Sequence, residues 1–281
     1  MTDKLSVKVD RALRLIRSAT GNDCSVVEVS YSGGKDSDVI LELTRMAGIR
    51  YRAIYKNTTI DPPGTIKHVR EVGAEIVRPS QTFFQWMAVN GFPNRFQRSC
   101  CRVLKEYKVL DRAIQGIRRC ESTKRSNIYQ EPTECRVYGK GRKMQSAEVF
   151  YPILDWTDAD IVEFIEQRGI KVHPLYYRED GSIEPTRRLG CMCCPLAYYK
   201  KRIEYFKQYP NMVKAYCRAV RKFMETHPDN KTVRKYGDVY EWFTRELFFE
   251  RQKYWDDYKT VMKYTPFNYQ EFLERYFSIR F

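Results

Sequence analysis

A glycine-rich hexapeptide near the N-terminus constrains this chain most, because it stands where a strand pattern gives way to a helix pattern. Residues 32–37 read Ser-Gly-Gly-Lys-Asp-Ser, follow the strand-like run 25–31 and precede the apolar positions of residues 39–43. Two glycines let backbone N–H groups point into one concavity, and a helix N-terminus adds partial positive charge. The segment therefore predicts a phosphate-binding loop, with an ordinary polar Gly-Gly turn as the alternative.

The composition is that of a basic globular protein. The chain has 281 residues, 43% of them hydrophobic, and a formal net charge of +15, which suits one large domain or a domain with an appendage. No apolar run is long enough for a membrane span, and residues 1–18 predict a surface helix rather than a signal peptide, so we expect a cytoplasmic protein. The positive charge favours a nucleotide, a nucleic acid or an acidic protein as partner; a solvated basic surface is the alternative.

Nine cysteines at uneven spacing argue against a disulfide framework and indicate metal or redox chemistry. Cys100 and Cys101 are adjacent, and a Gly-Cys-Met-Cys-Cys-Pro segment contains Cys191, Cys193 and Cys194. Adjacent cysteines rarely serve one zinc ion, whereas different irons of a cluster can bind them, and a Cys-x-x-Cys-Pro turn exposes N–H groups to sulfur. We predict a [4Fe–4S] cluster on the thiolates of Cys100, Cys101, Cys191 and Cys194. Structural zinc and inert buried thiols are the alternatives.

The remaining patterns predict an α/β fold followed by helices. Strands are expected at residues 51–55 and 74–77, and helices at 65–72, 83–89, 103–110 and 158–168. In the last of these helices, Ile161, Phe164 and Ile165 should face inward, with Thr157 or Asp158 as the N-cap. A polar, glycine-containing stretch at residues 121–147 predicts a mobile active-site loop.

From about residue 198 the composition shifts to basic residues interleaved with aromatic ones at helical spacing. We therefore expect two domains, at residues 1–197 and 198–281. This pattern is typical of nucleic-acid binding by phosphate contacts and base stacking, and equally of an aromatic core stripe beneath a solvated basic face.

The hexapeptide resembles the PP-loop of ATP pyrophosphatases, which cleave ATP between the α- and β-phosphates; its spacing is not that of the kinase and GTPase loop. The paired cysteines, with Cys-x-x-Cys-Pro about ninety residues later, resemble the adenylyl-sulfate and phosphoadenylyl-sulfate reductase family. Further segments match that family in order: residues 57–63, 116–125, 151–156 with Asp160, and 174–176. The resemblance covers about residues 24–200. It implies a Rossmann-like, mostly parallel sheet of the adenine nucleotide alpha hydrolase type with helices on both faces.

Two departures from the reductases change the predicted activity. Lys35 and Asp36 are both present, as in ATP-using loops, whereas the reductases usually have a degenerate loop without the lysine. The reductases also carry a catalytic cysteine near the C-terminus, whereas the last cysteine here is Cys217, which we predict to be a helix-face thiol. These features resemble the cluster-bearing PP-loop proteins that adenylate a target before sulfur insertion, in tRNA thiolation and DNA phosphorothioation.

The resemblance implies ATP, Mg²⁺ and a [4Fe–4S] cluster as cofactors, and it assigns roles to particular residues. The phosphates and Mg²⁺ would be held by Ser32, Gly33, Gly34, Lys35, Asp36 and Ser37, with Lys35 neutralising the leaving pyrophosphate. Asp61 is expected at the ribose or metal. Arg118, Arg119 and Arg125 are expected at a phosphate or anionic acceptor, with a salt bridge as the alternative for each. Cys193 is a spare thiol that either packs or carries a persulfide.

We predict that an acceptor oxygen attacks the α-phosphate of ATP and releases pyrophosphate, and that sulfur from a partner cysteine desulfurase then displaces the adenylate. A nucleic acid or another anionic molecule is the expected acceptor. Three alternatives stay open: a sulfonucleotide reductase that releases sulfite, the small subunit of ATP sulfurylase, and a nucleotide-gated scaffold. Oligomeric state is not predicted.

Overall fold

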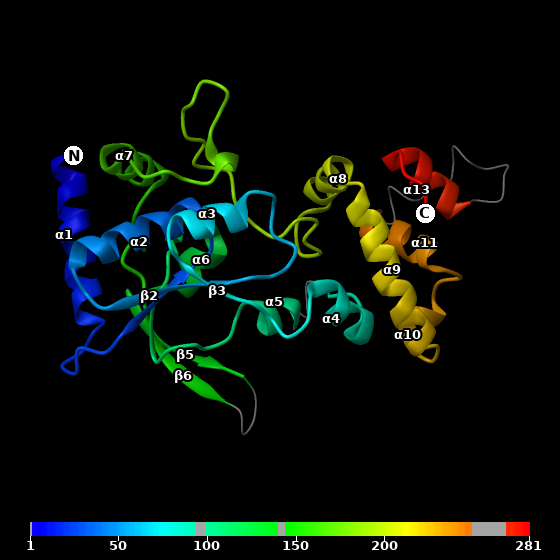
Figure 1. The fold of residues 1–281 in the computed structure, drawn as a ribbon, viewed down its shortest axis with the longest axis horizontal. Coiled ribbons are helices and arrows are strands. Elements are labelled where there is room, and N and C mark those ends of the chain that lie inside the picture. The colour runs from blue at the N-terminus through cyan, green and yellow to red at the C-terminus, as the bar shows by residue number, and fades with distance from the viewer. Residues whose placement is uncertain (1, 94–98, 140–143, 249–267) are drawn as a thin grey trace. The chain divides into compact units, whose positions relative to one another are not determined.

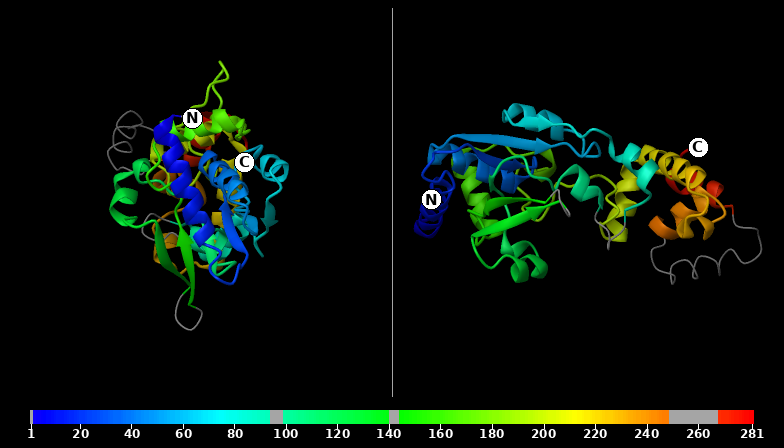
Figure 2. Two further views of the ribbon diagram at one scale, coloured as in Figure 1. Left: turned by 90° about the vertical axis from the view of Figure 1, so that its left-hand side faces the viewer. Right: turned by 90° about the horizontal axis from the view of Figure 1, so that it is seen from below.

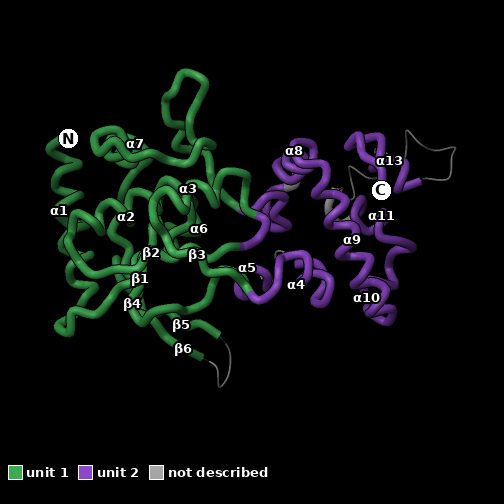
Figure 3. Tube along the Cα trace, in the orientation of Figure 1, with its two compact units in different colours: residues 1–57, 61–79, 104–190 green, residues 58–60, 80–103, 191–281 purple. Residues whose placement is uncertain are grey.

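The structure is a computed structural model that describes residues 2–93, 99–139, 144–248 and 268–281. It divides into two compact units (Figure 3). Unit 1 comprises residues 1–57, 61–79 and 104–190, and unit 2 comprises residues 58–60, 80–103 and 191–281. The predicted domain boundary between residues 197 and 198 is a statement about which parts of the chain fold independently, so it stays a prediction.

A sheet with the strand order β3-β2-β1-β4-β6-β5 forms the centre of unit 1 (Figure 1). Its strands are β1 (Val27–Tyr31), β2 (Tyr51–Lys56), β3 (Glu75–Val77), β4 (Arg112–Ile114), β5 (Thr133–Tyr138) and β6 (Gln145–Phe150). Neighbouring strands run parallel, except that β5 and β6 are antiparallel. The predicted α/β, mostly parallel Rossmann-like sheet is confirmed.

The strand order reverses between β1 and β4, because β2 and β3 extend the sheet on one side of β1 and β4 lies on the other. In open α/β sheets, ligands bind at such a reversal, beyond the carboxyl ends of the strands. The hexapeptide of residues 32–37 directly follows β1, and residues 115–118 directly follow β4. The topology therefore brings these two segments to the same edge of the sheet.

In the described part of unit 1, the sheet is accompanied by α1 (Asp3–Ser18), α2 (Lys35–Ala47), α3 (Thr65–Glu71), α6 (Thr123–Ile128) and α7 (Asp158–Arg168) (Figures 1 and 2). Helix α1 buries Leu5, Val9, Ala12 and Ile16, which share one helical face, so the predicted surface helix packed on the core is confirmed. Helix α2 packs against α1 and α7.

Helix α7 agrees with its prediction in both its packing and its cap. Ile161, Phe164 and Ile165 are buried. The Thr157 side chain accepts from the Asp160 N–H, and Asp160 returns a bond to the Thr157 N–H, which completes a capping box. The helices predicted at residues 65–72 and 83–89 and the strands predicted at 51–55 and 74–77 are also confirmed, with small shifts of their ends.

The prediction of a mobile loop at residues 121–147 is wrong for its described part. These residues contain α6, β5 and the first half of β6, and the two strands form an antiparallel pair from Thr133↔Phe150 to Tyr138↔Gln145. The polar character that suggested a loop is accommodated in the strand, because Arg136 donates to the Tyr151 hydroxyl (2.9 Å) and to the Gln115 side chain (3.0 Å). Pairing with β6 satisfies the backbone groups that a loop would leave to water.

The predicted helix at residues 103–110 is also wrong. Helix α5 covers Ser99–Leu104, and residues 105–110 are not helical. The Tyr107 carbonyl accepts from Lys56 Nζ (2.6 Å), and the Leu110 N–H donates to Glu28 Oε2 (3.4 Å). Side chains of the sheet therefore bind backbone groups that a helix would have used internally.

Unit 2 is helical in the part of it that the structure describes, as predicted. It contains α4 (Phe83–Asn90), α8 (Tyr199–Gln208), α9 (Asn211–Thr226), α10 (Lys231–Arg234), α11 (Val239–Trp242), η4 (Phe243–Phe248) and α13 (Tyr269–Phe277), besides most of α5. The Tyr216 ring on α9 is fully buried and lies 5.4 Å from the Phe206 ring and 5.7 Å from the Phe83 ring. Tyr216 and Phe206 therefore belong to an aromatic core, which was one of the two alternatives predicted for the region after residue 198.

None of the helices in the described part of the chain combines the length and the apolar content that a bilayer crossing needs.

Candidate functional site

The hexapeptide forms a tight turn from β1 into α2. Gly33 has a φ of +76°, in the left-handed region that favours glycine. The Gly34 carbonyl accepts from the Ser37 N–H (2.8 Å) and from the Ser37 hydroxyl (2.6 Å), and the Ser32 hydroxyl donates to Ser37 Oγ (3.2 Å). The two serines therefore shape the turn, and α2 presents its N-terminus at the carboxyl end of β1, where an anion is favoured.

A chain of charged groups joins this loop to the segment after β4. Lys35 Nζ lies 2.9 Å from Asp36 Oδ2, Asp36 Oδ1 lies 2.7 Å from Arg118 Nε, and Arg118 Nη2 lies 2.8 Å from Asp158 Oδ1. The Arg118 side chain is only 1% exposed. Burial pulls the pKa of Arg118 down, but the carboxylates of Asp36 and Asp158 overcome this effect and hold that pKa above its usual value. Arg118 thus has the salt-bridge role, in which it positions Asp36.

Gly116 allows this approach of the two segments. A Cβ atom at residue 116 would lie 2.9 Å from the Asp36 carbonyl oxygen, which is closer than real Cβ atoms come to backbone oxygen. Residue 116 must therefore be a glycine if the segment after β4 is to come close enough for Arg118 to reach Asp36.

Tyr176 covers the loop and was not predicted as a site residue. It lies in the 3₁₀ helix η3 (Pro174–Tyr176), and its ring centroid is 5.5 Å from Lys35 Nζ. Its hydroxyl oxygen accepts from the Leu189 N–H (3.1 Å) and from the backbone of Lys35. Burial raises the pKa of Tyr176 to about 12, so the phenol stays neutral. The sequence feature that could have identified Tyr176 is its place in segment 174–176, which resembles the reductase family.

The other predicted site residues of unit 1 are Asp61, Arg119 and Arg125, and each contacts a side chain of the same unit. Asp61 Oδ2 accepts from the Tyr55 hydroxyl (2.6 Å), on the loop that follows β2. Arg119 is ion-paired with Asp155 and donates to the Tyr129 carbonyl (2.8 Å), so it ties α6 to the turn before α7. Arg125 is ion-paired with Glu121, which also contacts Arg188. Among the described residues, Arg118 is the one of the three predicted arginines that contacts the loop, through Asp36.

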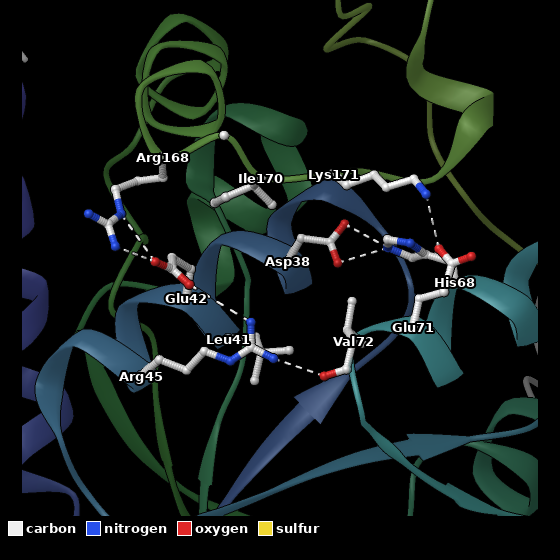
Figure 4. A pocket seen from close by; sticks show the side chains of 11 residues that line it. Asp38, Leu41, Glu42, Arg45, His68, Glu71, Val72, Arg168, Ile170 and Lys171 are labelled. Carbon is white, nitrogen blue, oxygen red and sulfur yellow. Dashed lines mark hydrogen bonds and ion pairs between the residues drawn. The ribbon is translucent and has the colours of Figure 1, made fainter.

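A separate pocket of about 270 Å³ opens between α2, α3 and α7 (Figure 4). Within it, His68 Nε2 lies 2.9 Å and 3.1 Å from the two carboxylate oxygens of Asp38. Burial raises the pKa of Asp38, against the opposing effect of His68 and Tyr31. The basic side chains of the rim contact acids or a carbonyl of the same rim: Arg168 with Glu42, Lys171 with Glu71, and Arg45 with the Val72 carbonyl. The rim is thus internally neutralised.

The four predicted cluster cysteines all belong to unit 2, where Cys100 and Cys101 lie on α5. The pKa of Cys100 is raised, first by a hydrogen bond with Cys101, then by burial, and then by the neighbouring groups of Cys101, Cys194 and Cys191. These effects place the four thiols in one neighbourhood. Among the described residues, however, no three Cys, His, Asp or Glu side chains have the arrangement of a metal site.

The chemistry of this donor set fits a cluster. Several thiols in a partly buried place resist ionisation because each thiolate would repel the next, and bound iron or zinc removes that cost. Other contacts hold the loop around residues 191–195: the Met192 N–H donates to the Ile60 carbonyl (2.7 Å), and the buried Arg202 donates to the Pro195 carbonyl (3.1 Å).

The two remaining cysteines that the sequence singled out are buried. Cys193 has a φ of +50°, and its carbonyl accepts from the Tyr216 hydroxyl (2.8 Å). Burial raises the pKa of Cys193, as it does that of Cys217 on α9. The prediction of Cys217 as a helix-face thiol is confirmed.

The phosphoadenosine phosphosulfate reductase domain matches residues 26–197, and this protein belongs to that family. It is 26% identical to an uncharacterised protein of Methanocaldococcus jannaschii, over 79% of this chain and 54% of that protein. It is 28% identical to a sulfate adenylyltransferase subunit 2 of Chromohalobacter salexigens, over 59% of this chain and 64% of that protein.

The chain spans about half the length of the curated relatives that it matches first. Similar solved structures include a phosphoadenylyl-sulfate reductase from Candida auris, with a TM-score of 0.41 and 14% identity over 68% of this chain and 98% of that chain. They also include the U34-tRNA thiolase NcsA from Methanococcus maripaludis with its [4Fe–4S] cluster, with a TM-score of 0.36 and 15% identity over 80% and 82%. The relatives whose names state an activity are enzymes.

Gly116→Ala is expected to destabilise the protein by about 1–3 kcal/mol, because the added methyl group meets the Asp36 backbone and forces the two segments apart. Urea unfolding measures the loss. Gly190→Ala is the matched control, since a Cβ there meets no atom within 4 Å and the residue does not have a positive φ. Equal stability of the two variants would contradict the close approach.

Tyr176→Phe is expected to cost about 1–2 kcal/mol in unfolding free energy, because buried N–H groups lose their acceptor. The same change should tighten pyrophosphate binding, since the phenol oxygen no longer competes for the Lys35 N–H. Calorimetric titration with pyrophosphate checks this. Weaker binding would show that the hydroxyl supports the anion instead of competing with it.

Proposed function

We propose that this protein is an ATP pyrophosphatase that adenylates an anionic acceptor for replacement by sulfur, as in nucleic-acid thiolation or DNA phosphorothioation. The observation that carries the proposal is the position of Lys35. It lies at the N-terminus of α2, at the edge where the strand order reverses, and it is 2.9 Å from Asp36. The name of the sulfate adenylyltransferase relative supports adenylyl transfer to an anion within this family.

In the proposed step, an acceptor oxygen forms a bond to the α-phosphorus of ATP and the bond to the bridging oxygen of the β-phosphate breaks. Pyrophosphate leaves with the electron pair, and the acceptor proton passes to solvent. Lys35 and the N-terminus of α2 stabilise the charge that develops on pyrophosphate. A sulfur nucleophile, supplied by a partner such as a cysteine desulfurase, then displaces AMP from the acceptor.

Asp36 is the residue that would hold Mg²⁺, and Arg118 fixes its orientation. One carboxylate oxygen of Asp36 faces Arg118 and the other faces Lys35. When bound, Mg²⁺ supplies further positive charge to the phosphates. Because Arg118 is itself held by Asp158, Asp36 keeps one position before the nucleotide arrives.

The same proposal includes a [4Fe–4S] cluster on Cys100, Cys101, Cys191 and Cys194, with zinc as the second candidate. Its support is that these thiols share one neighbourhood in unit 2. When bound, a cluster would stabilise unit 2 or hold sulfur at an open iron. The rival reductase activity needs a reactive thiol, and Cys217 is a poor nucleophile because it is buried and its pKa is raised.

Lys35→Ala is expected to lower pyrophosphate release from ATP by about 100-fold or more, because it removes the charge that stabilises the leaving group. Iron content per folded chain should change little. Lys171→Ala, at an exposed lysine of the same unit, is the control and should keep full activity. The measurement is pyrophosphate release by protein purified without oxygen, with each candidate acceptor.

Two results would contradict the proposal. One is full pyrophosphate release by the Lys35→Ala variant. The other is tighter binding of adenylyl sulfate than of MgATP together with sulfite release, which would replace adenylation by sulfonucleotide reduction.

Tyr216→Phe is expected to accelerate the loss of iron or zinc to a chelator by several-fold, because the Cys193 carbonyl loses its 2.8 Å hydrogen bond and the cysteine loop loosens. Metal content per chain is measured over time by elemental analysis. Tyr240→Phe is the control, since it removes a hydroxyl that accepts from Arg221 (2.7 Å) on the same helical unit. Equal release from both variants would show that the Tyr216 hydroxyl does not hold the loop.

A further inference from the structure

Strand β5 is an edge of the sheet in the part of unit 1 that the structure describes. Strand β6 pairs with one side of β5, and none of the other described strands pairs with its second side. An edge strand presents a row of backbone N–H and C=O groups to which another strand can pair. The direction of these groups and the charges beside them decide which strand fits.

The register with β6 shows which backbone groups of β5 point outward. The Tyr151 N–H donates to the Pro132 carbonyl (2.8 Å), whereas the Glu148 N–H donates on the other side of β6 to the Asp111 carbonyl (2.8 Å). Hydrogen-bonded and non-hydrogen-bonded pairs alternate along an antiparallel ladder, so β5 bonds to β6 at every second residue, counted from Pro132. The residues whose N–H and C=O groups point to the open edge are therefore Thr133, Cys135 and Val137.

The side chains of β5 divide between the two faces of the sheet. Cys135 is exposed and Val137 is 58% exposed, so a thiol and an apolar group reach solvent on one face. Glu134 and Arg136 lie on the opposite face, where a carboxylate oxygen and a guanidinium nitrogen are 2.7 Å apart. These two side chains are 34% and 26% exposed, so both charges can also act on a strand added at the edge.

The charges of β5 are complementary to those of a second β5 that runs antiparallel to it. When Cys135 lies opposite Cys135 of a second copy, Glu134 of each copy lies opposite Arg136 of the other. A shift by two residues keeps the outward backbone groups in phase, but it places Glu134 opposite Glu134 or Arg136 opposite Arg136. Opposite charges at facing positions favour strand pairing and like charges oppose it. The charges therefore select one register.

We propose that β5 is a self-association edge, to which a second copy of this chain adds its own β5, antiparallel and centred on Cys135. In this arrangement Cys135 exchanges backbone hydrogen bonds with its counterpart, and Thr133 of each copy does so with Val137 of the other. The sheets of the two copies become one continuous sheet. The proposal goes beyond the proposed function and does not depend on it.

Val137→Pro tests the backbone pairing. Proline removes an N–H that points away from β6, so the ladder between β5 and β6 is kept while the new edge loses a donor. The mass of the wild-type chain in sedimentation equilibrium should rise toward that of a dimer between about 10 and 100 μM, because small interfaces have micromolar affinities. Val137→Pro should raise the dissociation constant about ten-fold or more.

The matched control is Val137→Thr, which keeps both the N–H and the β-branched shape and should associate like the wild type. The unfolding midpoint of each variant is measured alongside. The net charge of +15 makes two copies repel each other, so all samples contain about 0.15 M salt, which screens exposed charges beyond about 8 Å.

The Cys135 thiol reports the register independently of proline. Facing residues of a hydrogen-bonded pair have Cα atoms about 5.5 Å apart, which a disulfide can span. Diamide, an azo oxidant, takes up the hydrogens of the two thiols and is reduced to a hydrazine while the S–S bond forms between the copies. A denaturing gel without reductant should show a covalent dimer for the wild type and for Cys24→Ser, which removes another exposed thiol, but not for Cys135→Ser.

Three results overturn the proposal: association that Val137→Pro leaves unchanged, a covalent dimer that persists in Cys135→Ser, and a wild-type chain that is monomeric at both concentrations. In the last case, a lower unfolding midpoint for Val137→Pro than for Val137→Thr would mean that the edge is paired within its own chain. If Val137→Pro does not fold, the cross-linking of the wild type and of Cys135→Ser decides alone.

Discussion

The site depends on one buried guanidinium group, that of Arg118. It reaches from the segment after β4 to Asp36 at the start of α2 and to Asp158 at the start of α7. Three parts of unit 1 are thereby joined at a single side chain that is 1% exposed. A buried pair of this kind is costly to break on one side, by about 3–5 kcal/mol, because the other charge is left uncompensated. The position of Asp36, and through it that of Lys35, follows from this interaction.

The cations around the PP-loop are compensated by the protein's own carboxylates. Lys35 contacts Asp36, Arg118 contacts Asp36 and Asp158, and Arg125 contacts Glu121. Such pairs keep the positive groups close together despite their repulsion, so the site is arranged before an anion arrives. Preorganised charge is effective in phosphoryl transfer because little reorientation is needed during the reaction. The neutral phenol of Tyr176 also helps to keep the loop in place, because its oxygen accepts a hydrogen bond from the backbone of Lys35.

Unit 2 brings together cysteines that stand far apart in the chain. The pair on α5 and the group at residues 191–194 fall in the same unit, together with the aromatic core around Tyr216. The Tyr216 hydroxyl bonds to the Cys193 carbonyl, so the packing of α9 is transmitted to the backbone of the cysteine loop. The helices of unit 2 therefore hold the backbone segment that carries these thiols.

What the sequence determined by itself was local. A strand, two glycines and a helix in succession define a phosphate-binding turn, and the periodicity of residues 158–168 defines α7 with its cap, because these patterns depend on neighbours within a few residues. The tertiary structure alone decided that β5 and β6 pair antiparallel at the sheet edge. It alone also decided that residues 105–110 are not helical, since side chains of other strands bind their backbone groups.

It also decided which charges meet. Asp36 and Arg118 are 82 residues apart, and Glu121 and Arg188 are 67 residues apart. No local pattern records such pairings. Asp36 and Arg118 meet because the parallel neighbours β1 and β4 end at one edge of the sheet, which places the segments that follow them in contact.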